Sequence, residues 1–104
     1  MHYDFIIVSK LDINPKHVDF KKFDEAEVFN NYIIVNNEKI TYDYLIIDKL
    51  YPSLNLFTED KHIITNQFLQ TSNDYIYAIG SINNCNIDLE KQIDIIEEHI
   101  MNPF

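Results

Sequence analysis

The chain has 104 residues, 46% of them hydrophobic, and this length predicts a single domain, residues 1–104, with a core of its own. Seventeen acidic residues against eight basic ones give a formal net charge of −9, which argues against binding to nucleic acid or to an anionic membrane surface. A single cysteine excludes a disulfide framework, and no apolar run approaches the roughly 20 residues of a membrane span, so we expect a cytoplasmic protein.

Three short apolar runs predict buried strands, because each is nearly continuous and rich in β-branched and aromatic residues. They lie at residues 3–8 (YDFIIV), 42–47 (YDYLII) and 75–79 (YIYAI). A continuous apolar run is typical of a strand covered on both faces, as in a parallel sheet. The sequence therefore predicts a parallel core of three strands.

An antiparallel meander is expected between the first two runs. The chain has only one glycine, so the turns are expected at the pairs Asn30-Asn31 and Asn36-Asn37, because asparagine tolerates the left-handed backbone region. The strands of the meander are expected at residues 26–29, 32–35 and 39–41. Further short strands are expected at residues 18–20 and 62–65.

Residues 87–101 predict one amphipathic helix. Its apolar positions recur at steps of four, three and four, which places them on one face: Leu89, Ile93, Ile96 and Ile100. Asn86 or Asp88 can cap its start, and Pro103 is expected to end it. The acidic positions lie mostly on the other face, which we interpret as solvated: Asp88, Glu90, Asp94, Glu97 and Glu98. These elements together predict an α/β or α+β fold.

Residues 60–84, DKHIITNQFLQTSNDYIYAIGSINN, resemble the closing segment of the pyridine nucleotide-disulfide oxidoreductases, and of thioredoxin reductases in particular. The most specific part is the run from Thr71 to Gly80, TSNDYIYAIG. Residues 40–47, ITYDYLII, are similar to the strand that ends the meander of that family, and residues 3–8 are similar to its opening strand. The resemblance implies a small FAD/NAD(P)-binding-like domain.

The first cofactor-binding position departs from the family pattern. After its opening strand the family has a glycine-rich turn and a helix, whose backbone N–H groups hold a pyrophosphate. This chain has Ser9 and Lys10 there, no glycine, and Pro15 soon afterwards. Because no glycine permits the close approach of a diphosphate, the phosphate-binding turn is missing.

Two further departures concern the flavin and the redox chemistry. Asp48-Lys49-Leu50 replaces the Ala-Thr-Gly of the family, and Ser81 stands where the family has an aspartate that binds the ribityl chain. The redox Cys-x-x-Cys pair is missing, since Cys85 is alone. The chain therefore resembles a truncated and degenerate member of the family, and we expect no catalysis of its own.

The residues that follow the three predicted strands form the candidate cofactor site, because open α/β sheets bind ligands beyond the carboxyl ends of their strands. They are Ser9, Lys10, Asp48, Lys49, Gly80 and Ser81. The alternative is that these residues are ordinary loop ends, and we expect no cofactor, with FAD as the alternative. Cys85 is interpreted as a small core residue and not as a reactive thiol. The four histidines have no zinc-ligand spacing, so no metal site is expected.

The expected function is that of an interaction or oligomerisation module, working as a homo-oligomer or with a protein partner. A flavin domain without its partner domains exposes apolar surface, which a homodimer can bury. Most aromatic residues are expected in the core, among them Phe5, Tyr44, Phe68 and Tyr77. Others are expected at an interface: Tyr32, Tyr51, Tyr75 and Phe104. The alternatives are a subunit that binds FAD or another nucleotide, and an unrelated β-rich domain with a convergent TS…IYAIG run.

Overall fold

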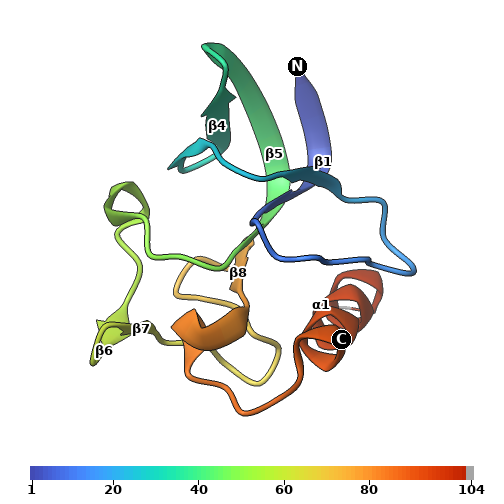
Figure 1. Cartoon of the computed structure of the whole chain (residues 1–104), viewed down its shortest axis with the longest axis vertical. Helices are drawn as coiled ribbons and strands as arrows, with labels where there is room; N and C mark the ends of the chain where they lie inside the picture. Colours follow the sequence, from blue (N-terminus) through green and yellow to red (C-terminus); the bar gives the residue numbers. More distant parts are fainter. Residues whose placement is uncertain (103–104) are drawn as a thin grey trace.

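A computed structural model describes residues 1–102, and its main feature is one mixed β-sheet (Figure 1). Five strands follow in the order β2–β1–β5–β4–β3, and β8 pairs with β5. Their bounds are β1 His2–Val8, β2 Lys21–Phe23, β3 Glu27–Phe29, β4 Tyr32–Val35, β5 Glu38–Ile47 and β8 Ile76–Ala78. The expected helix end at Pro103 and the expected interface residue Phe104 lie outside the described residues.

The three predicted apolar runs are parallel neighbours in this sheet. β5 lies between β1 and β8, and both pairs run parallel. Ile47 is opposite Val8 on one side and opposite Ala78 on the other. The predicted parallel core is confirmed. Together with the C-terminal helix, it gives the small α/β or α+β fold that the sequence predicts.

The antiparallel meander is confirmed as well. β3 pairs with β4, and β4 pairs with the first half of β5, both antiparallel. Asn31, Asn36 and Asn37 have φ angles of 74°, 51° and 65°, so the asparagine pairs make the two turns. β5 is the longest strand because its first half belongs to the meander and its second half to the parallel core.

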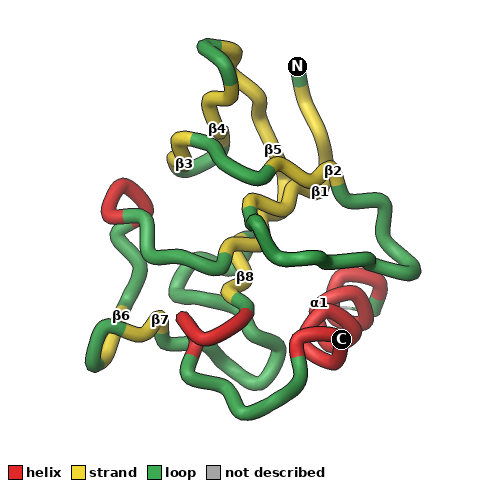
Figure 2. The backbone as a smooth tube through the Cα atoms, viewed as in Figure 1, coloured by secondary structure: helices red, strands yellow, loops and turns green. Residues whose placement is uncertain are grey.

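Two short strands differ from their expected positions. The strand expected at residues 18–20 is β2, which begins at Lys21 and pairs in parallel with the end of β1. β2 is a short strand at the edge of the sheet, held by backbone pairing to β1. Its sequence, KKF, has no alternation of apolar and polar residues from which the strand could be predicted. The strand expected at residues 62–65 is shorter: β7 (His62–Ile63) pairs with β6 (Thr58–Glu59) in a separate hairpin. Figure 2 shows this hairpin at the margin of the molecule.

The core lies on both faces of the sheet. One cluster joins the parallel strands to the meander and includes Ile6, Leu45 and Ile76, which are fully buried. The other cluster joins the sheet to helix α1 (Leu89–Met101), whose Ile93 and Ile96 face inward as the helical spacing predicts. In Figure 1 the loop that follows β1 runs past this helix. No described helix meets the length and apolarity that a membrane crossing requires.

The interpretation of the acidic helix face is wrong at one position, Glu97. Its side chain is 1% exposed, and its carboxylate accepts backbone N–H groups from Lys16 at 3.0 Å, His17 at 2.5 Å and Val18 at 2.6 Å. Burial, the largest single influence, raises the pKa of Glu97, but the three hydrogen bonds together outweigh it and hold the pKa below its usual value. Glu97 thus fastens the loop after β1 to the helix.

The aromatic residues expected in the core are buried to different degrees. Tyr77 is 1% exposed, and Phe5 and Tyr44 are partly buried and stack on one another, with ring centroids 5.6 Å apart. Phe68 is 37% exposed, because it stacks only on His99, at 4.2 Å, while the adjacent Leu69 takes the buried position. The expectation of a buried Phe68 is therefore wrong.

Candidate functional site

The residues after β1, β5 and β8 meet at one end of the parallel strands, which we call the carboxyl edge and define as Ser9, Asp48, Gly80 and Ser81. The pairing of the strands places their ends in register, and the backbone N–H of Ile79 donates to the carbonyl of Ile47 at 2.9 Å. This is the part of an open sheet where a ligand is expected.

Ser9 and Asp48 are in direct contact at this edge. Ser9 is 2% exposed; its hydroxyl donates to Asp48 Oδ2 at 2.7 Å and accepts the backbone N–H of Leu11 at 2.9 Å. The other carboxylate oxygen, Asp48 Oδ1, is buried and has no hydrogen-bond partner among residues 1–102. The ends of β1 and β5 are therefore joined by a serine and a carboxylate, at the position where the resemblance implies a phosphate-binding turn.

Gly80 is already engaged by the protein itself. Its φ of +75° is one that glycine adopts without strain. Its backbone N–H, a group that a ligand at this edge would use, donates to Gln92 Oε1 of α1 at 2.9 Å. Leu11 lies over it, since a Cβ on Gly80 would be 3.7 Å from Leu11 Cδ1. The backbone N–H of Gly80 is thus used within the chain, and Leu11 covers part of the glycine.

A buried amide pair behind Gly80 holds this arrangement. Gln92 and Asn83 are 2% and 7% exposed, and Asn83 Nδ2 donates to Gln92 Oε1 at 3.1 Å and to the carbonyl of Ala78 at 2.7 Å. Gln92 Nε2 donates to the carbonyl of Ile87 at 2.7 Å. Neither residue was predicted from the sequence, because an amide on a helix face or in an asparagine pair looks like ordinary surface.

The remaining predicted site residues do not join the contact between Ser9 and Asp48. Ser81 lies at the carboxyl edge but is exposed. Lys10 pairs with Glu25, Nζ to Oε1 at 2.5 Å, on the surface, and this hydrogen bond raises the pKa of Lys10. Lys49 lines a different cavity of about 420 Å³ beside the meander, together with Glu25 and Tyr51. The structure thus brings Ser9 and Asp48 together with Gly80 but does not bring the two lysines to them.

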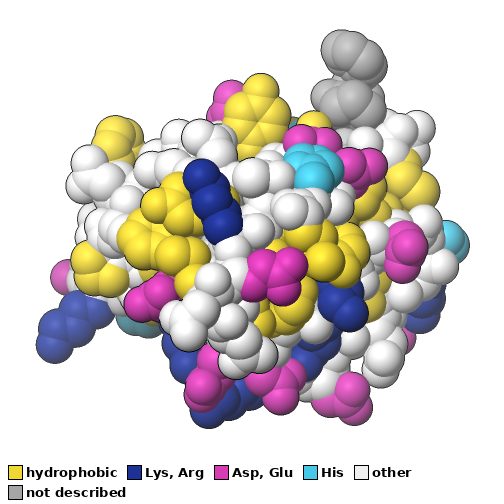
Figure 3. All heavy atoms as spheres, turned by 90° about the horizontal axis from the view of Figure 1, so that it is seen from above, with side chains coloured by type: hydrophobic (Ala, Val, Ile, Leu, Met, Phe, Trp, Pro, Cys, Tyr) yellow, Lys and Arg dark blue, Asp and Glu magenta, His cyan; other side chains and the backbone are white. Residues whose placement is uncertain are grey.

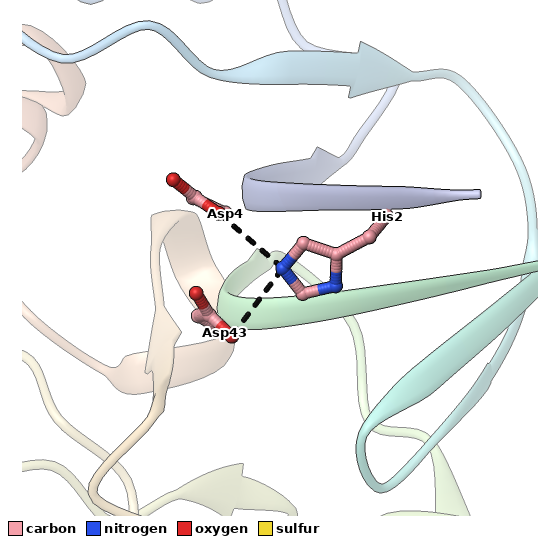
Figure 4. Close-up of side chains that lie close together, drawn as sticks. All are labelled: His2, Asp4 and Asp43. Carbon is pink, nitrogen blue, oxygen red and sulfur yellow. Dashed lines mark ion pairs between the residues drawn. The ribbon is translucent and has the colours of Figure 1, made fainter.

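A second group of polar side chains lies toward the other end of β1 and β5. His2 Nε2 is 3.3 Å from Asp4 Oδ1 and 3.4 Å from Asp43 Oδ1, and all three side chains are exposed (Figure 4). His2 Nδ1 lies 2.6 Å from Thr41 Oγ1. Histidine spacing along the chain did not indicate this group, because Asp43 reaches it only through the pairing of β1 with β5.

Comparison with known proteins adds no relative, since no family model, no curated protein and no solved structure matches the chain. The function is therefore inferred from the sequence motifs of the chain and from the geometry of the two sites.

Proposed function

We propose that this chain is a protein similar to the pyridine nucleotide-disulfide oxidoreductases that carries no catalysis of its own and acts as an interaction and oligomerisation module. The observation that carries the proposal is the carboxyl edge, which is occupied by the chain itself. Ser9 and Asp48 bind one another, Gln92 accepts the backbone N–H of Gly80, and Leu11 covers part of this glycine.

The arrangement of the strands supports the resemblance. The three runs that are similar to family strands are β1, the end of β5 and β8, and they are parallel members of one sheet with β5 in the middle. A meander leads into β5, as the resemblance implies. Strands running in opposite directions would have removed this support.

The charge at the carboxyl edge disfavours the binding of a dinucleotide. A diphosphate is bound by backbone N–H groups and by positive charge. Here the ionisable side chain of the carboxyl edge is the half-buried Asp48, while the exposed Lys10 is paired with Glu25. The carboxylate would repel the ligand, because like charges in a poorly solvated place interact strongly.

The surface that we assign to self-association is an apolar pair at the base of the β6–β7 hairpin. Phe57 and Ile64 are 69% and 46% exposed, and the backbone N–H of Ile64 donates to the carbonyl of Phe57 at 3.0 Å. The hairpin tip carries Asp60 and Lys61, so two copies related by a two-fold axis can pair opposite charges around the apolar pair. Figure 3 shows that hydrophobic side chains are also exposed among charged ones on the face seen from above.

The replacement Phe57→Ser tests this function. We expect the purified chain to form dimers in sedimentation equilibrium, and Phe57→Ser to weaken dimerisation by about 30-fold, since an aromatic anchor contributes about 2 kcal/mol to an interface. Met101→Ser, which removes a 47% exposed side chain at the end of α1, is the matched control and should leave dimerisation unchanged. A monomeric wild-type chain, or equal weakening by both variants, would contradict the proposal.

The second candidate function is a subunit that binds FAD or another nucleotide, and one observation favours it. Asp48 Oδ1 is a buried acceptor for which the described part of the chain supplies no donor, and the hydroxyl of a ribose or ribityl chain could satisfy it. Purified protein that carries the visible absorbance band of flavin would favour this alternative, whereas colourless protein favours the module.

A further inference from the structure

We propose that His2, Asp4 and Asp43 form a binding site for a divalent transition-metal ion of the zinc type. This proposal does not depend on the module function, because the site lies on β1 and β5 away from the carboxyl edge. One imidazole nitrogen and two carboxylate oxygens are a donor set that zinc accepts.

The distances between the donor atoms fit such an ion. His2 Nε2 is 3.3 Å and 3.4 Å from the two carboxylate oxygens, and one ligand atom from each residue lies within 4.8 Å of the others. A tetrahedral zinc ion with bonds of about 2.0–2.1 Å separates its ligand atoms by about 3.3 Å. The carboxylates therefore need only a small rotation to close on an ion.

The sheet itself presents these donors together. His2 and Asp4 are two residues apart on β1, so they lie on the same face. The register pairs His2 with Thr41 and Phe5 with Tyr44, which sets Asp43 beside Asp4 on the neighbouring strand. Two paired strands hold their side chains more firmly than a loop does. In Figure 4 both aspartates point toward the same ring nitrogen of His2.

Thr41 orients the imidazole as an outer-shell partner orients a metal-binding histidine. Thr41 Oγ1 lies 2.6 Å from His2 Nδ1 and donates to the carbonyl of Met1 at 3.4 Å. In the tautomer that carries its proton on Nδ1, His2 donates this hydrogen bond to Thr41 Oγ1 and leaves Nε2 free to bind a metal ion. The lone pair of Nε2 then faces the two carboxylates, so a metal ion placed between them can bind all three side chains.

Exposure of the group gives the ion a path and an open position. The side chains of His2, Asp4 and Asp43 are 46%, 68% and 58% exposed. Three protein ligands leave the fourth position of a tetrahedral ion to water. Among the described residues, this is the one group whose histidine, cysteine or carboxylate atoms converge in this way.

Zn²⁺ titration of the full chain, produced without a histidine tag, tests the proposal by calorimetry. We expect one Zn²⁺ per chain, and we expect Co²⁺ at the same site to give the strong visible absorption of tetrahedral coordination. His2→Gln and Asp43→Asn should each weaken Zn²⁺ binding by more than about 100-fold. Thr41→Val should weaken it by about 10-fold, because it removes only the orienting partner.

Two substitutions elsewhere serve as matched controls. His62→Gln removes a histidine outside the group, and Asp19→Asn removes an exposed carboxylate outside it; neither should change Zn²⁺ affinity. Circular dichroism spectra equal to that of the wild-type chain show that the variants are folded. Absence of Zn²⁺ binding would overturn the proposal. Equal affinity in wild type, His2→Gln and Asp43→Asn would overturn it as well.

Discussion

Replacement of Glu97 with glutamine is expected to lower the free energy of unfolding by about 2–4 kcal/mol. Hydrogen bonds to a charged group contribute about 1.5–3 kcal/mol each, and donors left unsatisfied in a buried place cost further free energy. Glu97 accepts three backbone N–H groups, from Lys16, His17 and Val18, with a side chain that is 1% exposed. An amide offers one oxygen without charge, so it cannot replace all three bonds.

Urea unfolding at neutral pH measures this effect, with Glu98→Gln as the control. Glu98 is the next residue on the helix and is exposed, so its replacement should change the free energy of unfolding by less than about 0.5 kcal/mol. Equal stability of Glu97→Gln and wild type would show that the carboxylate does not hold the loop.

The contribution of Glu97 also predicts a pH dependence. The pKa of Glu97 in the folded chain is lower than its ordinary value of 4.5, so the ionised form favours folding. This contribution is fully present above the pKa of the unfolded chain and is lost as the pH falls through the pKa of the folded chain. The stability difference between wild type and Glu97→Gln should therefore shrink below about pH 4.5.

Ile47→Ala should destabilise the chain by about 2–5 kcal/mol, the range for removing a large aliphatic side chain from a core. Ile47 is fully buried and lies between Val8 of β1 and Ala78 of β8, at the centre of the parallel core. For a domain of this size each kcal/mol lowers the midpoint of thermal unfolding by about 4–8 °C.

Scanning calorimetry of Ile47→Ala and of Ile87→Ala compares the same chemical change at two exposures. Ile87 is 39% exposed and lies outside the surface assigned to self-association, so its replacement should have a much smaller effect, within about 0.5 kcal/mol. Similar losses at both positions would contradict the placement of the end of β5 in the middle of the sheet.

Most of the fold was predictable because the signals are local. The three apolar runs, the asparagine turns and the helical spacing from Leu89 to Ile100 each reflect how a short segment is covered or turned. β2 and Glu97 were not predicted correctly. β2 exists through pairing with β1, and Glu97 is buried by backbone N–H groups about eighty positions earlier in the chain.

The candidate sites were likewise predictable only where a local signal in the sequence determines them. That Ser9 and Asp48 meet follows from the rule that parallel strands end at one edge. Ser9 and Asp48 also bind one another, and Leu11 lies over Gly80. Both contacts depend on side-chain packing that no sequence pattern shows. The group around His2 depends on the register between two strands, and a shift of one residue would have moved Asp43 to the other face.

Thermal unfolding of the wild-type chain, with and without saturating FAD, most directly tests whether the carboxyl edge is closed by its own side chains. A ligand that binds the folded state raises its stability, by about 2.7 kcal/mol at a hundred times its dissociation constant. The closed edge predicts the same midpoint in both samples. A midpoint that rises with FAD concentration would contradict it and would favour a retained flavin site.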